Sequence, residues 1–230
     1  MVVAAAVAAG AVAAVTELTR ADELRAFAEV VAGCTKCPLA GGRTQVVFGS
    51  GDPGADLMFV GEAPGFHEDK QGVPFVGAAG KLLDQLLSEI GLTRADVYVA
   101  NVLKCRPPGN RDPQPEEIEA CESHLWRQIE LIEPRVVATL GNFATKLLSG
   151  RPTGITRVHG QEQETSLGGR RVLLYPIYHP AAALYTPRML EVLRSDFARI
   201  PELIGREIPP PEPAPEPLVA AEPAVQLGLF

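Results

Sequence analysis

The chain has 230 residues, of which 46% are hydrophobic and 21% charged, so it is long enough for one well-packed domain and is not a chain disordered throughout. Its net charge of −7, averaged over the whole chain, argues against a nucleic-acid-binding protein. However, residues 207–230 contain four Glu and no Lys or Arg, whereas residues 104–206 contain 14 basic and 12 acidic residues. Binding to DNA therefore stays open.

The first 15 residues are almost all Ala and Val. They lack a basic start and lead directly into a polar segment, so they make a poor secretory signal. We interpret residues 1–18 as a disordered or helical extension. No run of the chain reaches the roughly 18 apolar residues of a membrane span. We therefore expect a cytoplasmic, reducing environment in which disulfides are rare.

The central part of the chain alternates between strand and helix patterns. Apolar residues recur at helical spacing in residues 21–33, and four short apolar runs follow at residues 57–60, 97–100, 136–140 and 172–175. Continuous apolar runs are typical of strands buried on both faces. Further helical segments lie at residues 81–90, 115–132, 143–148 and 189–204. This order predicts an α/β fold, a three-layer sandwich with helices on both faces of a central, mainly parallel four-stranded sheet.

The composition changes abruptly at Glu207. Seven of the 21 prolines lie in residues 207–230, together with four glutamates. This composition predicts an extended, unfolded linker over residues 207–225. The chain then ends on a largely apolar pentapeptide, residues 226–230. We therefore expect residues 19–206 to form the folded domain.

Ligands of open parallel α/β sheets bind beyond the carboxyl ends of the strands. Each of the four predicted strands is followed there by a polar or glycine-bearing turn, and the first of these turns carries Gly61, Glu62, Ala63, Pro64, Gly65 and Glu68. The other turns carry Asn101, Asn142 and His179. One such residue alone is usually a turn or capping residue, but the four turns together predict one shared pocket. Phe75, in a nearby proline-stiffened loop, either stacks on a planar ligand such as a base or fills the core.

The cysteines form one pattern across the chain: Cys34, Cys37, Cys105 and Cys121. Four thiols with none left over suggest a single four-ligand site. Zinc sites prefer two closely spaced pairs, whereas the second pair here is wide. Iron–sulfur clusters tolerate such dispersed ligation. The spacing alone leaves three interpretations, which are an iron–sulfur cluster, a zinc site and unrelated buried thiols.

Several segments together resemble the family 4 uracil-DNA glycosylases, the iron–sulfur members of the uracil-DNA glycosylase superfamily. These segments are GEAPG at 61–65 followed by ED at 68–69, PFVG at 74–77, NVLKCRPP at 101–108 followed by NRDP at 110–113, and YHP at 178–180. The resemblance covers approximately residues 28–200. It implies a structural [4Fe–4S] cluster on the four cysteines. It also implies hydrolysis of the N-glycosidic bond of a flipped-out deoxyuridine in single- or double-stranded DNA, which leaves an abasic site.

The resemblance further implies roles for the residues at the strand ends. Phe75 is expected to stack on uracil, Asn101 to read the edge of the base, and His179 to stabilise the negative charge that grows on O2 as the bond breaks. The predicted substrate-binding set also includes Gly61, Ala63, Pro64 and Gly65.

Water activation is less clear from the motif, because better-known relatives have Asp or Asn at the position that matches Ala63. We expect Glu62 and Asn110 to share this task as direct participants. Glu68 is expected to act beside them, either in catalysis or as an organiser of the loop.

Two further segments suggest contacts with macromolecules. Residues 178–188 resemble the loop that enters the DNA helix in this family. We therefore expect Leu184 or Tyr185 to act as the wedge and Arg188 to contact DNA, although Leu184 would equally suit helix packing. The pentapeptide resembles the bacterial sliding-clamp-binding motif, and the residues expected to bind are Gln226, Leu227, Leu229 and Phe230. A tail that folds back on the domain is the other interpretation of this segment.

The sequence thus predicts a monomeric enzyme of base excision repair, a uracil-DNA glycosylase. The main alternative is a non-catalytic module that binds DNA or uracil and uses the cluster only as a structural staple.

Overall fold

A computed structural model describes residues 18–206. The predicted linker, the predicted clamp-binding pentapeptide and all but the last residue of the predicted N-terminal extension lie outside the described residues. Within residues 18–206, no helix combines the length and the apolar character needed to cross a bilayer.

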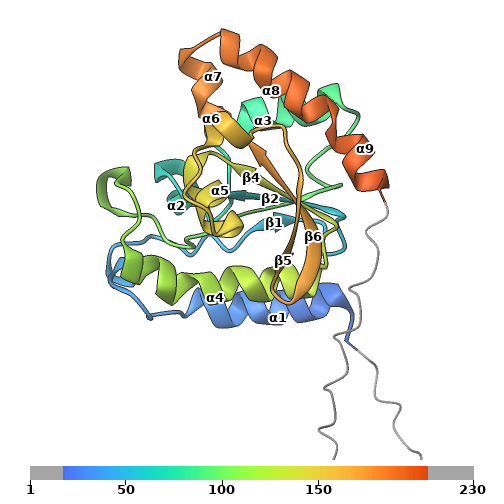
Figure 1. Ribbon diagram of the computed structural model, residues 1–230. Helices are drawn as coiled ribbons and strands as arrows, with labels where there is room; N and C mark the ends of the chain where they lie inside the picture. Colours follow the sequence, from blue (N-terminus) through green and yellow to red (C-terminus); the bar gives the residue numbers. More distant parts are fainter. Residues whose placement is uncertain (1–17, 207–230) are drawn as a thin grey trace, which may run out of the picture.

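A six-stranded sheet forms the middle layer, in the order β1-β3-β2-β4-β6-β5 (Figure 1). Its strands are β1 (Ser50–Gly51), β2 (Leu57–Gly61), β3 (Tyr98–Asn101), β4 (Val136–Leu140), β5 (Gln163–Leu167) and β6 (Arg170–Ile177). The four central strands are parallel and correspond to the four predicted ones, so the predicted α/β sandwich is confirmed. Two antiparallel edge strands, β1 and β5, extend the predicted sheet. The apolar runs did not indicate them, because β1 is only two residues long and β5 is mostly polar and partly exposed.

Nine α-helices surround the sheet in the described part of the chain. They are α1 (Arg20–Ala32), α2 (Phe66–Gln71), α3 (Ala78–Glu89), α4 (Pro115–Ile132), α5 (Asn142–Ser149), α6 (Ile155–Val158), α7 (Ala181–Tyr185), α8 (Arg188–Ala198) and α9 (Ile200–Gly205). The helix predicted over residues 189–204 is two helices, α8 and α9, which meet at Arg199. Pro201 lies in the first turn of α9, where a residue without an amide hydrogen is tolerated.

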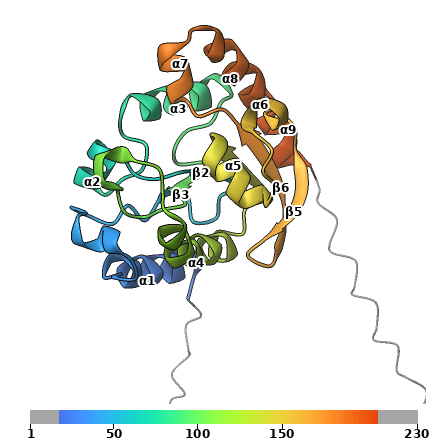
Figure 2. The same ribbon diagram turned by 60° about the vertical axis from the view of Figure 1, so that its left-hand side comes forward.

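Alternation of side chains along each strand divides the core into two layers. In β2, Met58 and Val60 face one side of the sheet and pack with α1, α4 and α5. Leu57 and Phe59 face the other side and pack with α3, α8 and α9. Figures 1 and 2 show the two helical layers on either side of the sheet, with α1 and α4 side by side. Both faces of the sheet are therefore buried, and a ligand must approach from an edge or from the strand ends.

One lysine lies inside this core. Lys104 follows β3 and is 1% exposed, and its Nζ donates hydrogen bonds to the carbonyl oxygen of Asn101 at 2.7 Å and to Oε1 of Gln128. The amide of Gln128, on α4, donates in turn to the carbonyl oxygen of Phe48 at 2.8 Å. Burial disfavours the ammonium form and lowers the pKa of Lys104 to about 7. This hydrogen-bond chain joins the end of β3 to α4 and to the segment before β1.

We expect Gln128→Leu to lower the free energy of unfolding by about 1–3 kcal/mol, because leucine removes an acceptor from the buried Lys104 ammonium group. Urea unfolding followed by circular dichroism under anaerobic conditions measures this change. Gln85→Leu is the matched control, since Gln85 bonds to Glu89 on an exposed surface, and we expect a change of at most about 0.5 kcal/mol. Equal unfolding midpoints for wild type and Gln128→Leu would contradict the stabilising role of the chain.

Candidate active site

A cleft opens where β2, β3 and β6 end, as predicted for a parallel sheet. The predicted site residues that line it are Glu62, Ala63, Pro64, Gly65, Glu68, Phe75, Asn101, Asn110, His179 and Tyr185. Gly61 is the last residue of β2 and is in register with Asn101, the last residue of β3. A second groove, lined in part by Asn142 and Lys146, adjoins the cleft and shares Glu62 and His179 with it. The turns that follow four parallel strands therefore do contribute to one continuous depression.

Asn101 carries an unusual atom for a protein interior. The residue is 2% exposed, and its Oδ1 has no hydrogen-bond partner within residues 18–206. A Cβ atom at Gly61 would lie 2.4 Å from this oxygen and 2.8 Å from the ring of Phe75, so the glycine allows the amide and the ring to come together. Because a buried acceptor without a partner is costly, this oxygen marks a place where a ligand donor fits.

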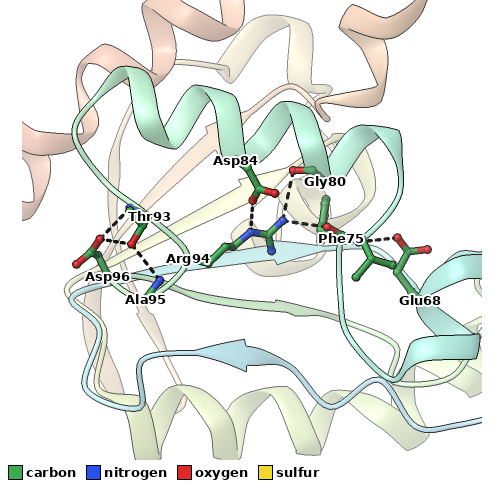
Figure 3. Close-up of polar contacts among 9 residues, drawn as sticks. Glu68, Phe75, Gly80, Asp84, Thr93, Arg94, Ala95 and Asp96 are labelled. Atoms are coloured by element: carbon green, nitrogen blue, oxygen red, sulfur yellow. Dashed lines mark hydrogen bonds and ion pairs between the residues drawn. The ribbon is translucent and has the colours of Figure 1, made fainter.

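The loop that carries Phe75 is held in a strained conformation. Phe75 has a φ of +55°, which is uncommon for a residue with a side chain. Its carbonyl oxygen accepts a hydrogen bond of 2.9 Å from Arg94, which also pairs with Asp84 on α3 (Figure 3). A Cβ atom at Gly80 would lie 1.7 Å from the same carbonyl oxygen, so only glycine fits there. Arg94 gave no signal in the sequence, because it reaches this loop from the turn before β3.

Glu68 holds the same loop from the other side. Its Oε1 accepts hydrogen bonds from the backbone N–H groups of Val76 and Gly77, each at 3.0 Å. Figure 3 shows the carboxylate turned towards the loop. Because Oε1 of Glu68 accepts hydrogen bonds from two amides of the Phe75 loop, these contacts fit a role in organising that loop. This was one of the two roles expected for Glu68 from the sequence.

His179 lies against Phe75 at the end of β6. The two rings are nearly parallel, with centroids 5.5 Å apart. Burial of the imidazole lowers the pKa of His179 to about 4, so the ring is neutral at physiological pH. The backbone N–H of Ala181 donates to Nδ1 at 3.1 Å. Because Nδ1 is an acceptor, the single proton of the neutral ring is on Nε2.

Glu62 and Asn110 occupy different environments in the cleft. Glu62 is partly buried, and burial, together with the nearby Asp112, raises the pKa of its carboxyl group. Asn110 is exposed and has a φ of +54°. Its Oδ1 accepts a hydrogen bond of 2.7 Å from Arg106, so its amide NH₂ group is the end that remains for other partners.

The predicted DNA-contacting residues lie beside the cleft. Leu184 and Tyr185 form the end of α7 and are 45% and 86% exposed, so neither is a core residue. Arg188 begins α8 and is also exposed. Of these three, only Tyr185 lines the cleft.

A small, separate pocket is lined by the four cysteines, Cys34, Cys37, Cys105 and Cys121, which come from the segment after α1, the loop after β3 and helix α4. Three nitrogen groups contact the sulfur atoms. Arg43 donates to Sγ of Cys105 at 3.4 Å, and the backbone N–H of Lys104 donates to Sγ of Cys121 at 3.3 Å. Nε2 of His124 lies 3.3 Å from Sγ of Cys34. Donors of this kind stabilise thiolates.

The thiols do not converge as ligands of one ion would. Among residues 18–206 there is no group of three or more His, Cys, Asp or Glu side chains that could hold a metal ion. Burial raises the pKa of Cys105, and it raises that of Cys121 to about 11. The geometry therefore places four free thiols around one cavity without closing them on a single point.

Comparison with known proteins identifies the family. Residues 48–199 match the family model described as the uracil DNA glycosylase superfamily. A type-4 uracil-DNA glycosylase of Archaeoglobus fulgidus is 50% identical over 78% of this chain and 92% of that protein. Proteins of the same description from Sulfurisphaera tokodaii and Thermotoga maritima are 48% and 47% identical, over 79% and 82% of this chain and 85% and 98% of their own lengths. The chain therefore belongs to the uracil-DNA glycosylase superfamily.

Proposed function

We propose that this protein excises uracil from DNA by hydrolysing the N-glycosidic bond of a flipped-out deoxyuridine. The observation that carries the proposal is the buried Oδ1 of Asn101, which has no hydrogen-bond partner among the described residues and lies in a cleft that also presents a neutral histidine. The description shared by the relatives, type-4 uracil-DNA glycosylase, supports the same activity.

The chemistry of the Asn101 amide suits uracil. Its Oδ1 accepts a hydrogen bond from N3–H of the base, and its Nδ2 donates to O4. Cytosine presents an acceptor at position 3 and a donor at position 4, so both pairings are reversed. A buried amide left with mismatched partners disfavours that base strongly. The ring of Phe75 supplies the stacking surface beside this edge.

His179 acts on the leaving group. When the bond between C1′ and N1 breaks, its electron pair passes to the uracil ring and negative charge grows on O2. The Nε2–H of the neutral imidazole donates a hydrogen bond to that oxygen and stabilises the charge. Because the pKa of about 4 lies far below neutrality, the donor is the imidazole over the working pH range.

Water adds to C1′ on the opposite side, and Glu62 is the base that takes its proton. A raised pKa brings this carboxylate closer to the basicity that proton transfer at neutral pH requires. Asn110 orients the water through its amide NH₂ group, because Arg106 occupies its oxygen. Ala63 has no polar atom for this task, and Glu68 acts through the loop that it holds.

The substrate strand is bound beside the cleft by exposed residues of α7 and α8. Leu184 and Tyr185 enter the space left by the flipped nucleotide, and Arg188 contacts a phosphate. Gly61 and Gly65 let the chain approach the base closely, and Pro64 stiffens the turn between them.

The cysteine cavity fits a [4Fe–4S] cluster better than a zinc ion. The four thiols come from three separate segments of the chain, and such dispersed thiolate ligands would suit an iron–sulfur cluster better than a zinc site, which prefers two closely spaced pairs. The residues that would hold the cluster are Cys34, Cys37, Cys105 and Cys121. Such a cluster would cross-link the segment after α1, the β3 loop and α4, and it would supply no step of the hydrolysis.

The remaining parts of the chain have proposed roles too. Residues 19–206 act as the catalytic domain, and residues 207–225 act as the tether of the terminal pentapeptide. The terminal residues Gln226, Leu227, Leu229 and Phe230 bind a DNA sliding clamp, with the apolar side chains in a pocket and the glutamine at its rim. The protein works as a cytoplasmic monomer.

We expect wild-type protein to release uracil from a single-stranded oligonucleotide, and His179→Ala to lower kcat by about 100-fold, because the donor to O2 is lost. The visible absorbance of the cluster should be the same in both proteins, which serves as the control for folding. Failure of the wild type to release uracil while its cluster is intact would favour the non-catalytic module instead. Equal kcat in the variant would exclude the role of His179.

We expect the purified holoprotein to be brown and to contain about four iron and four acid-labile sulfide per chain, with no zinc. Cys121→Ser should lose most of the colour and lower thermal stability, because α4 is no longer joined to the β3 loop. Ser123→Ala, on an exposed hydrogen bond of the same helix, is the matched control and should keep the colour. Stoichiometric zinc without iron would refute the proposed cluster.

We expect the full-length chain to capture the bacterial sliding clamp in a pull-down, and the double variant Leu229→Ala, Phe230→Ala to lose this binding. Burial of these two side chains supplies the apolar part of the contact. Uracil release from a free oligonucleotide should not change, since the tail lies outside residues 19–206. Equal capture of both proteins would contradict the clamp-binding role.

A further inference from the structure

Phe66, the first residue of α2, is an aromatic side chain that the fold leaves half exposed. Its ring is not part of either core layer. It directly follows Gly65, which lines the cleft, and precedes His67, which lines it as well. A large apolar side chain is therefore exposed to solvent at the edge of the candidate active site. None of the proposed steps of uracil excision uses this side chain.

Cationic side chains lie next to this ring. The guanidinium carbon of Arg106 is 5.2 Å from the ring centroid, and Nζ of Lys70 is 5.9 Å from it. The imidazole of His67 meets the ring edge-on, with centroids 5.5 Å apart. Cations beside an aromatic face are attracted to its electrons. An exposed aromatic ring flanked by positive charge is also the combination with which proteins bind single-stranded nucleic acids, because the ring stacks on a base and the cations face the phosphates.

This group is continuous with the cleft. Arg106 contacts the ring of Phe66 and also donates to Oδ1 of Asn110, which lines the cleft. Tyr185, which is 86% exposed, lines the cleft from α7. The cleft thus has exposed aromatic residues at its margin on two separate elements, α2 and α7. A strand whose uridine enters the cleft has to run its neighbouring nucleotides over this margin.

We infer that Phe66, Arg106 and Lys70 form a stacking platform for a nucleobase of single-stranded DNA, one that neighbours the flipped uridine. The inference rests on the proposed function, since it takes the cleft as the uracil site. The positive charges of Arg106 and Lys70 beside the ring indicate which kind of molecule stacks on it. They suit a base that is attached to phosphates better than an apolar protein segment. Stacking that tolerates any base also gives affinity without sequence preference.

The test measures binding of full-length holoprotein to single-stranded oligonucleotides by fluorescence anisotropy. Each oligonucleotide carries one non-cleavable 2′-fluoro-deoxyuridine, and in each member of the set a different neighbouring base is replaced by an abasic spacer. We expect removal of one particular base to weaken binding to the wild type by about fivefold or more. Phe66→Ala should weaken binding to the intact oligonucleotide by the same factor and should be insensitive to removal of that base. Phe66→Trp should restore the affinity.

The control variant is Val30→Ala, because Val30 is an exposed apolar residue on α1, 72% exposed. This variant should bind every oligonucleotide with the affinity of the wild type. Equal affinity of Phe66→Ala and wild type would overturn the platform. The platform would also be overturned if, for every spacer, the loss of affinity caused by Phe66→Ala and the loss caused by the spacer multiply when the two changes are combined. That result would mean that the ring and the bases contribute to binding independently. The experiment measures binding to a strand that cannot be cleaved. A protein that releases no uracil would therefore refute the proposed activity, whereas the binding data alone decide whether the platform exists.

Discussion

The structure depends on a buried lysine amino group that has to be hydrogen-bonded. Lys104 sits in the segment that joins the uracil-reading residue proposed here, Asn101, to Cys105. Its Nζ bonds to the carbonyl oxygen of Asn101 and to Gln128, and its backbone N–H bonds to Sγ of Cys121. A polar group inside a core, charged or neutral, costs free energy unless its hydrogen-bond partners are in place. The end of β3, helix α4 and the cysteine cavity are therefore coupled, and a change in one is felt at the others.

Burial shifts the pKa values of His179 and Glu62, two titratable groups of the cleft, in the directions that their proposed roles require. It holds His179 neutral with a proton on Nε2, and it raises the pKa of Glu62. A neutral donor and a carboxylate of increased basicity arise from the same loss of solvent. Glu62 and Glu68 both line the cleft, but they differ in their partners: Oε1 of Glu68 accepts hydrogen bonds from two backbone amides, whereas burial raises the pKa of Glu62.

The loop between Glu68 and α3 shows how strain is supported at such a site. The left-handed conformation of Phe75 places its ring against His179, and it costs of order 1–3 kcal/mol. Arg94, Glu68 and the close approach at Gly80 hold this conformation from three sides. These three residues lie on α2, on α3 and in the turn before β3. The position of the Phe75 ring therefore depends on three separate segments and not only on its own loop.

The sequence by itself determined the parallel sheet and the set of chemically able residues. Apolar runs of strand length identify β2, β3, β4 and β6 because both faces of these strands are buried, and the turns after them carry Glu62, Asn101 and His179. It did not indicate the edge strands, because β1 has only two residues and β5 is mostly polar. It also did not indicate the break at Arg199 between α8 and α9, because the apolar residues continue at helical spacing across it.

Only the tertiary structure decided how each candidate residue is used. Within residues 18–206 it leaves Oδ1 of Asn101 without a hydrogen-bond partner, places a backbone amide on Nδ1 of His179, and brings Arg106 from the loop after β3 over Phe66 of α2. It also ties Glu68 to the backbone of a neighbouring loop. A local pattern specifies which functional groups are present, but hydrogen-bond partners and burial come from contacts between segments far apart in the chain. Those contacts set protonation, orientation and exposure, which are the properties on which the chemistry depends.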